Sequence, residues 1–197
     1  MCGRYYVDDE TSREILKIVK ELDKKFDNAQ IKTGEIFPTN DVPILVAKNN
    51  EIEPDIFKWG FPNFSNKSVI INARSETVFE KKMFRESIVS RRCIVPASGF
   101  YEWNKSKEKI SFSRPGSSIM FMAGIYNIYS TEPRFVILTT NANSSISDVH
   151  DRMPLILNND QINDWLNDGQ RTQFFLSQVP CLLNRKSDYE QIGLDLT

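Results

Sequence analysis

The chain has 197 residues, of which 40% are hydrophobic and 26% charged, and its 25 Lys and Arg residues against 26 Asp and Glu residues give a formal net charge of −1. This length and composition are typical of one globular domain with a substantial core, and the near-zero charge excludes a uniformly basic nucleic-acid binder. A single histidine excludes a metal centre built from several histidines, and three cysteines without a C-x-x-C pair exclude a disulfide framework or a zinc knuckle. No run is long enough to cross a membrane and the N-terminus lacks the layout of a secretory signal, so we expect a cytosolic protein with no membrane partner.

The first predicted element is an amphipathic helix near the N-terminus. Thr11 and Glu14 have the spacing of a capping box, and apolar residues follow at positions 15, 18, 19, 22 and 26. From about residue 36 the pattern changes to short runs rich in Ile, Val, Phe and Tyr that are separated by turn residues, which predicts strands. The predicted strands are 43–48, 52–59, 68–72, 93–103, 110–113, 118–129 and 134–140.

Short helices are expected at 76–90 and 144–151, and a last helix at about 160–168, which Asp168-Gly169 ends. A run of strands with helices at the ends and edges predicts an α+β fold. We expect a single domain over residues 1–197, in which a largely antiparallel β-sheet curls into a barrel-like core with flanking helices.

The near-zero net charge hides an asymmetry along the chain. Residues 74–114 carry ten basic and five acidic side chains, a balance of +5, whereas residues 147–197 carry four basic and eight acidic ones, a balance of −4. This split is compatible with one anion-facing surface and equally with two solvated faces.

The N-terminal residues Met1-Cys2-Gly3-Arg4 offer an unusual nucleophile. Removal of Met1 would leave Cys2 with a free α-amine beside its thiol, and both groups are partly available for reaction at neutral pH. Such an aminothiol adds to an aldehyde as an imine, which the thiolate then closes to a thiazolidine ring in a fast intramolecular step. Taken alone, however, Cys2 is much more often simply a small second residue without chemistry.

Two further polar residues follow a β-branched run. Asn72 and Arg74 are two positions apart and therefore share one face of the expected strand. The alternative is a strand exit that leads into a helix cap at Ser75-Glu76.

Glu102 and His150 are candidates for proton transfer. Glu102 lies among aromatic residues in an apolar run, where it either faces outward, the commoner case, or lies in a low-dielectric pocket that raises its pKa. His150 is the only histidine, and histidine suits proton transfer near neutral pH, although a lone histidine in a loop is more often structural. Cys93 is expected to be a small buried hydrophobic residue.

Aromatic and basic residues also interleave as single-stranded nucleic acid would require. Phe37-Pro38, Trp59–Phe61 and Phe100-Tyr101 would offer stacking surfaces or wedges. The basic residues that would meet phosphates are Arg4, Arg74, Arg91 and Arg92.

Considered together, these features resemble one family, the SOS response-associated peptidase (SRAP) proteins, which sense abasic sites in single-stranded DNA. The similarity covers nearly the whole chain in order, and it resembles the compact bacterial or phage form. The motifs that carry it are Met1–Tyr5, Lys58–Gly60, Ile71–Thr77, Arg92–Pro96, Gly99–Trp103, Leu138–Asn143 and His150–Pro154.

The resemblance implies four catalytic residues. Cys2, after loss of Met1, would link covalently to the ring-opened sugar aldehyde of an abasic site, and Asn72 would position the Cys2 amine and the sugar. Glu102 would be the acid and base for ring opening and imine formation. His150 would transfer protons near the sugar and its phosphate, including in reversal of the crosslink.

The resemblance also implies DNA contacts. Arg4 and Arg74 would bind phosphates, Thr139 would form a polar wall of the pocket, and Pro38 with Trp59 would belong to the surface that breaks base stacking at the lesion. The partner would be single-stranded DNA with an abasic site, bound by a monomer without a metal ion or other cofactor.

Two positions depart from the family pattern. Residues 34–37 read Gly-Glu-Ile-Phe where many relatives have Tyr-Asn ahead of the proline, and Glu35 there is expected to weaken a DNA contact. Ser98 stands where an Asp is common. Neither departure affects the proposed nucleophile.

Three functions are compatible with these residues. The first is the covalent abasic-site sensor, with associated autopeptidase and lyase activity. The second is an N-terminal-nucleophile hydrolase or cysteine peptidase that acts on amide bonds, with His150 or Glu102 as the base for Cys2. The third is a non-covalent module that binds single-stranded DNA.

Overall fold

The structure, a computed structural model, describes residues 3–22, 32–63 and 68–187, and within the first helix it describes side chains only as far as residue 17. A closed barrel of five strands lies at its centre. Four of the strands pair in a row, and the fifth, residues 132–141, pairs with both ends of that row and so closes the barrel. β12 pairs in parallel with β4, and the other pairings around the barrel are antiparallel. The barrel strands are β3 (Asp41–Lys48), β4 (Glu51–Trp59), β8 (Arg92–Ala97), β11 (Met120–Tyr129) and β12 (Glu132–Asn141).

Three short strands extend this barrel. β7 (Asn72–Arg74) runs parallel to β12, β13 (Arg152–Pro154) pairs with the end of β12, and β14 (Ile156–Leu157) pairs with β11. The small hairpin of β5 (Phe61–Pro62) and β6 (Val69–Ile70) is separate.

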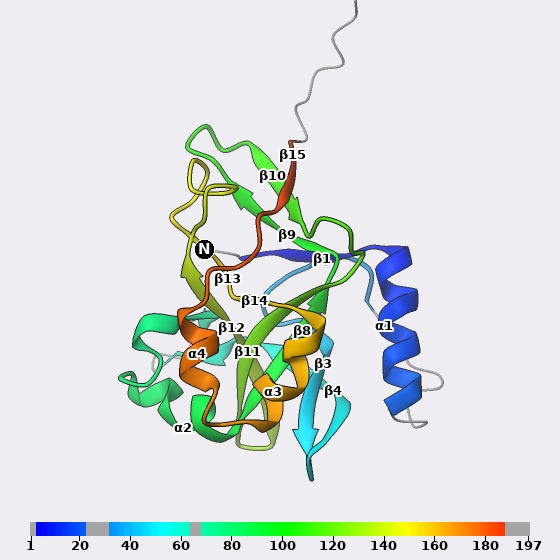
Figure 1. The fold of residues 1–197 in the computed structure, drawn as a ribbon, viewed down its shortest axis with the longest axis vertical. Helices are drawn as coiled ribbons and strands as arrows, with labels where there is room; N and C mark the ends of the chain where they lie inside the picture. The colour runs from blue at the N-terminus through cyan, green and yellow to red at the C-terminus, as the bar shows by residue number, and fades with distance from the viewer. Residues whose placement is uncertain (1–2, 23–31, 64–67, 188–197) are drawn as a thin grey trace, which may run out of the picture.

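A second, antiparallel sheet crosses one end of the barrel (Figure 1). Its strand order is β15 (Asn184–Ser187), β10 (Lys109–Ser113), β9 (Gly99–Trp103), β1 (Tyr5–Val7) and β2 (Gly34–Ile36). β9 follows β8 with one residue between them, so the chain passes directly from the barrel into this sheet. That residue, Ser98, is buried, and its hydroxyl accepts a hydrogen bond from the backbone N–H of Asp8 at 2.7 Å.

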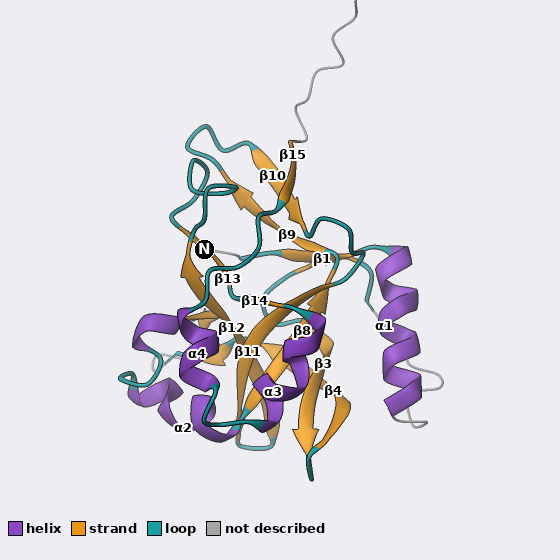
Figure 2. Ribbon diagram, viewed as in Figure 1, coloured by secondary structure: helices purple, strands orange, loops and turns teal. Residues whose placement is uncertain are grey.

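Helices cover the barrel on two sides. α2 (Lys82–Ser90), α3 (Ile162–Asn167) and α4 (Thr172–Ser177) gather together, and α1 (Asp9–Leu22) lies apart from them beside β4 (Figure 2). All six residues of β8 are buried, because the strand packs on the barrel interior and also against α2 and α3. The indole of Trp165 in α3 donates a hydrogen bond to the Cys93 carbonyl oxygen at 3.0 Å.

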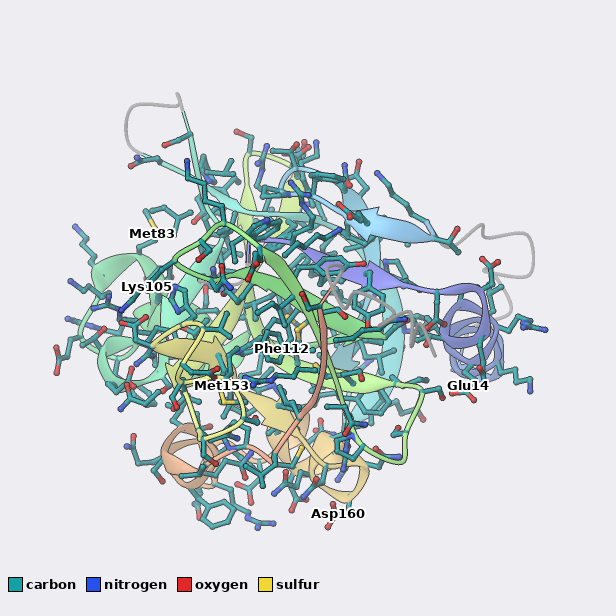
Figure 3. All side chains as sticks on the ribbon, turned by 90° about the horizontal axis from the view of Figure 1, so that it is seen from above. Glu14, Met83, Lys105, Phe112, Met153 and Asp160 are labelled. Carbon is teal, nitrogen blue, oxygen red and sulfur yellow. The ribbon has the colours of Figure 1, made fainter. Side chains whose placement is uncertain are left out.

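The interior is apolar and aromatic. Trp59 and Phe135 are fully buried with ring centroids 6.4 Å apart, and Phe112 and Met153 are also inaccessible to solvent. In the view from above, Phe112 and Met153 lie toward the centre, whereas Glu14 and Asp160 lie toward the edge (Figure 3). The expectation that Cys93 is a buried hydrophobic residue is confirmed, and burial raises the pKa of its thiol.

The predicted fold class is confirmed, but several predicted elements have different bounds. The capping box was assigned to the wrong residues, because the Asp8 carboxylate accepts from the Thr11 N–H at 2.7 Å and α1 already begins at Asp9. Phe26, the last apolar position of that predicted helix, lies outside the described residues.

The predicted strands 68–72 and 93–103 are each divided into two strands, β6 and β7 in the first case and β8 and β9 in the second. The predicted helix 76–90 is a 3-10 turn (Ser75–Thr77) followed by α2. Residues 144–149 are consecutive turns instead of a helix, because the Asn143 side-chain oxygen accepts from both the N–H and the hydroxyl of Ser145. Helix α4 was not predicted.

Arg92 is a structural residue, so the prediction that it meets phosphate is wrong. Its guanidinium is buried and donates hydrogen bonds to four backbone carbonyl oxygens, which belong to Ile88, Val89, Trp165 and Leu166. These bonds join α2 to α3 behind β8.

Within the described residues, no helix is both long and apolar enough to span a bilayer.

Replacing Arg92 with Met should lower the free energy of unfolding by about 2–4 kcal/mol, because buried carbonyl oxygens lose their donors. Urea denaturation measures this change. Arg13→Met, which makes the same substitution on the exposed side of α1, should change stability by less than about 0.5 kcal/mol. Equal losses in the two variants would contradict the structural role of Arg92.

Candidate functional site

Glu102 lies on the inward face of β9. Phe100 and Glu102 are buried, whereas Tyr101 and Trp103, on the alternate positions, are half-buried on the outer face. The expectation that an outward carboxylate is the commoner case therefore does not hold, since Glu102 is only 3% exposed. Burial raises the pKa of Glu102, and the positive charge of nearby His150 partly opposes this shift. Such a carboxyl is suited to general acid catalysis.

His150 lies at the end of the loop between β12 and β13. Its Nδ1 accepts a hydrogen bond from the backbone N–H of Arg152 at 2.9 Å and lies 2.9 Å from the Asp151 Oδ1 atom. In the neutral ring, acceptance at Nδ1 leaves the proton on Nε2. In the protonated ring, Asp151 can accept from Nδ1. The two contacts therefore require different states of Nδ1, an acceptor for the Arg152 N–H and a donor for Asp151.

A buried guanidinium fixes the chain beside His150. Arg152 donates to both carboxylate oxygens of Glu76, at 2.7 and 2.8 Å, to Asn141 Oδ1 at 2.6 Å and to the Thr139 carbonyl oxygen at 2.7 Å. We call these four residues the Arg152 clamp. The clamp joins β13 and the end of β12 to the 3-10 turn that follows β7. It was missed from the sequence, because one chain contains no signal that pairs residues 76 and 152.

Asn72 and Arg74 lie on the strand that the Arg152 clamp holds. Ala73 between them is buried, while Asn72 is half-buried and Arg74 exposed, which agrees with the expected common face for the two polar residues. β7 pairs with β12 so that Arg74 lies opposite Thr139. Thr139 is fully buried, and its hydroxyl oxygen has no hydrogen-bond partner among the described residues.

Arg4 lies on the outer face of the second sheet. Its guanidinium is 4.4 Å from the ring centroid of Phe37 and 5.0 Å from that of Trp103, and it donates to Glu35 at 2.9 Å. Because Trp103 and Glu102 alternate on β9, Arg4 lies on the opposite face of this sheet from Glu102. The structure therefore does not bring these two predicted residues together.

Pro38 and Trp59 differ in their surroundings. Pro38 is half-buried in a surface turn beside Phe37, which is 40% exposed. Trp59 is fully buried, and its indole N–H donates to the Ile71 carbonyl oxygen at 3.0 Å, so the expectation that its ring belongs to a DNA-facing surface is wrong. Its backbone instead holds the turn, through bonds with Thr39 and Asn40 of 2.8 and 3.0 Å.

Cys2, the predicted nucleophile, lies outside the described residues. A cavity of about 340 Å³ lies near Glu102 and His150. Two of its lining residues are their direct neighbours, because Ile110 pairs with Glu102 across β9 and β10 and Val149 precedes His150. It is lined by Asn104, Glu108, Ile110, Asp148, Val149, Arg185 and Ser187.

In the described ranges, no group of three or more His, Cys, Asp and Glu side chains is arranged to hold a metal ion.

Replacing Glu76 with Gln should lower the free energy of unfolding at pH 7 by about 0.5–1 kcal/mol, because it removes the charge partner of a buried guanidinium, although solvent partly screens the 43% exposed carboxylate. The hydrogen bond from Arg152 holds the pKa of Glu76 below its usual 4.5, so this stabilisation is present above pH 4.5 and is lost as the pH falls through the lower, folded-state pKa. Urea denaturation across this pH range measures the difference between the two proteins.

The matched control is Glu86→Gln, since Glu86 is 84% exposed and pairs with Arg91 at the surface. We expect it to change stability by less than about 0.5 kcal/mol at any of these pH values. A stability difference for Glu76→Gln that did not shrink at low pH would contradict the ion pair.

Comparison with known proteins supplies the family. The family model described as SOS response associated peptidase (SRAP) matches residues 1–189. "Abasic site processing protein YoaM" of Bacillus subtilis (strain 168) is 30% identical over 194 residues, which cover 91% of this chain and 85% of that protein. "Abasic site processing protein YoqW" of Bacillus phage SPbeta is 31% identical over 182 residues, with coverage of 85% and 80%.

The fold is also that of a solved structure. A crystal structure of a protein from Bacteroides thetaiotaomicron has a TM-score of 0.80 at 24% identity and covers 94% of this chain and 91% of that one. Together with the match over residues 1–189, which contains every candidate residue described above, these comparisons show that the chain belongs to the SRAP family.

Proposed function

We propose that this protein processes abasic sites in single-stranded DNA and that Cys2, after removal of Met1, forms a covalent thiazolidine with the ring-opened sugar. Membership of the family and the names of its curated relatives support abasic-site DNA as the substrate. The observation that carries the chemistry is the buried carboxyl of Glu102 beside His150, which provides two proton-transfer groups of different environment in one place.

The reaction begins with the opening of the sugar. Protonated Glu102 donates to the ring oxygen while the C1 hydroxyl gives its proton to His150, so that the hemiacetal opens to the aldehyde at C1. The Cys2 amine then attacks C1, and the resulting carbinolamine loses one water molecule to give an imine. The thiolate adds to the imine carbon while the nitrogen takes up a proton, which closes a five-membered ring. One water molecule is lost overall.

Ring closure protects the DNA strand. An imine at C1 acidifies the adjacent carbon and favours β-elimination, which breaks the strand. The thiazolidine no longer contains the C=N bond, so elimination stops. Because the thiol and the imine belong to the same residue, closure has a high effective molarity and competes well with elimination.

The other residues position the substrate. We assign Asn72 to the Cys2 amine and the sugar, His150 to proton transfer at the sugar and in crosslink reversal, and Thr139 to the pocket wall. Arg74, which is exposed, would bind phosphate near these groups, and Pro38 would support the surface that faces the unstacked bases. Trp59 acts from the core, by holding the turn that contains Pro38.

Peptidase activity fits the same residues. Release of the amino acid or short peptide that precedes Cys2 would expose the amine that the crosslink requires. An amide hydrolase that uses Cys2 with His150 or Glu102 as base is the alternative function, and it differs in leaving no DNA adduct.

Replacing Cys2 with Ser should change the outcome from crosslinking to strand cleavage, because the amine still forms the imine but no thiol closes the ring. Gel electrophoresis of a single-stranded oligonucleotide with one abasic site separates crosslinked, intact and cleaved strands. Cys181→Ser, at an exposed free cysteine, is the matched control and should crosslink like the unmodified protein. Equal crosslinking by Cys2→Ser and the unmodified protein would rule out the thiazolidine.

Replacing Glu102 with Gln should slow crosslinking by about 10²-fold or more, which is the usual contribution of a general acid or base. Because only the protonated carboxyl donates to the ring oxygen, this contribution is present below the raised pKa of Glu102 and is lost above it. The crosslinking rate of the unmodified protein should therefore fall as the pH rises through that pKa, and the rate of Glu102→Gln should not show this fall. Glu51→Gln, the same change at an exposed position at the start of β4, should retain both the rate and its pH dependence. An unchanged profile in Glu102→Gln would exclude Glu102 as the acid.

A further inference from the structure

We propose that Glu35 is an internal competitor for DNA phosphate, which limits the affinity and the salt dependence of DNA binding by occupying the cations Arg4 and Lys109. This inference rests on the proposed function, because it concerns how the protein binds single-stranded DNA. It also adds Lys109 to the residues that face DNA.

The geometry places one carboxylate between two cations. Glu35 Oε2 accepts from Arg4 at 2.9 Å, and Glu35 Oε1 accepts from the ammonium group of Lys109. The three residues come from separate strands of the second sheet, with Glu35 in β2, Lys109 at the start of β10 and Arg4 directly before β1. Both carboxylate oxygens are therefore engaged, one with each cation.

Aromatic rings hold the two cations in place. Arg4 lies over Phe37 and Trp103, and the Lys109 ammonium is 3.9 Å from the ring centroid of Tyr101. Cations over aromatic faces are partly pre-positioned, and exposed aromatic rings beside basic groups form the usual surface for single-stranded nucleic acid. This outer face of the second sheet has the composition of a DNA-binding surface, apart from its central carboxylate.

The carboxylate remains charged under the conditions of DNA binding. The hydrogen bond from Lys109 and the charges of Lys109 and Arg4 hold the pKa of Glu35 below its usual value, although burial opposes this shift. The side chains of Arg4, Glu35 and Lys109 are 31%, 30% and 23% exposed, so an incoming phosphate can reach them. Pairs of this kind are weak in water, and a phosphate can therefore exchange with Glu35 at a moderate cost.

Competition by Glu35 suits a protein that forms a covalent bond. Phosphates are the same on damaged and undamaged strands, so strong phosphate binding would hold the protein on undamaged DNA. A weakened Arg4–Lys109 site lets the protein leave undamaged strands, whereas reaction at C1 retains it at a lesion. Glu35 thereby shifts selectivity from phosphate contact to the aldehyde.

The test is the affinity of Glu35→Gln for an undamaged single-stranded oligonucleotide, measured by fluorescence anisotropy over a series of salt concentrations. We expect binding about 3- to 10-fold tighter than that of the unmodified protein, because two weak ion pairs no longer have to be broken. The dependence of log K on log salt should become steeper by about 0.7 for each additional phosphate contact. An unchanged midpoint of urea denaturation excludes misfolding as the source of the gain.

Two controls separate local competition from a general change in charge. Glu53→Gln makes the same substitution on β4, where Glu53 pairs with Lys48 at 3.4 Å near the β3–β4 turn, and it should bind as the unmodified protein does. Lys109→Gln combined with Glu35→Gln should remove most of the gain. An affinity for Glu35→Gln that is unchanged, weaker, or raised only as much as by Glu53→Gln would overturn the proposal.

The same proteins mixed with an abasic oligonucleotide distinguish the two proposals. If the unmodified protein crosslinks but Glu35→Gln shows no gain in affinity, the competitor role fails and the proposed function stands. If Glu35→Gln gains affinity but no protein crosslinks, the competitor role is supported and the covalent function fails.

Discussion

The guanidinium of Arg152 connects two parts of the chain that are 76 residues apart. Its planar fork matches the two oxygens of the Glu76 carboxylate, and this bidentate geometry fixes both orientation and distance. Asn72 and Arg74 lie on the strand that ends just before Glu76, and His150 lies two residues before Arg152 and accepts a hydrogen bond from its backbone. The relative placement of two polar motifs, and with it the proposed site, therefore depends on this one ion pair between a buried guanidinium and an exposed carboxylate.

Much of the fold could be predicted because its strands are clearly patterned. The runs of β-branched and aromatic residues that became β3, β4, β11 and β12 have turn residues at both ends, and the predicted barrel-like α+β fold is confirmed. Residues 93–103 were predicted as one strand although Pro96, Ser98 and Gly99 mark the break, because β8 is buried on both faces and the apolar run resumes directly in β9. The inward position of Glu102 and the burial of Trp59 depend on how two sheets pack against each other. The ion pairs of Arg152 with Glu76 and of Arg4 with Glu35 join residues far apart in the sequence. The residue pattern of a single chain predicts neither.

The positive charges of Arg4, Lys109 and Arg152 are compensated locally, by carboxylates of neighbouring side chains. Near-zero net charge excludes a uniformly basic surface, but the structure shows that neighbouring carboxylates compensate individual cations in different ways. Arg152 is buried and bonded to Glu76, Asn141 and Thr139, so it shapes the site. Arg4 and Lys109 are instead partly exposed and share Glu35, so they can exchange it for phosphate. Net charge describes solubility, and the burial of each ion pair determines which cations are available to DNA.

Covalent attachment through the N-terminus is the step on which the proposed chemistry depends, and intact mass spectrometry tests it most directly. The purified protein should first show loss of Met1. After mixing with a single-stranded oligonucleotide that contains one abasic site, its mass should increase stably by that of one DNA strand less one water molecule, with the link at Cys2. An unchanged protein mass, with either turnover of peptides or retained non-covalent binding to the strand, would contradict the account.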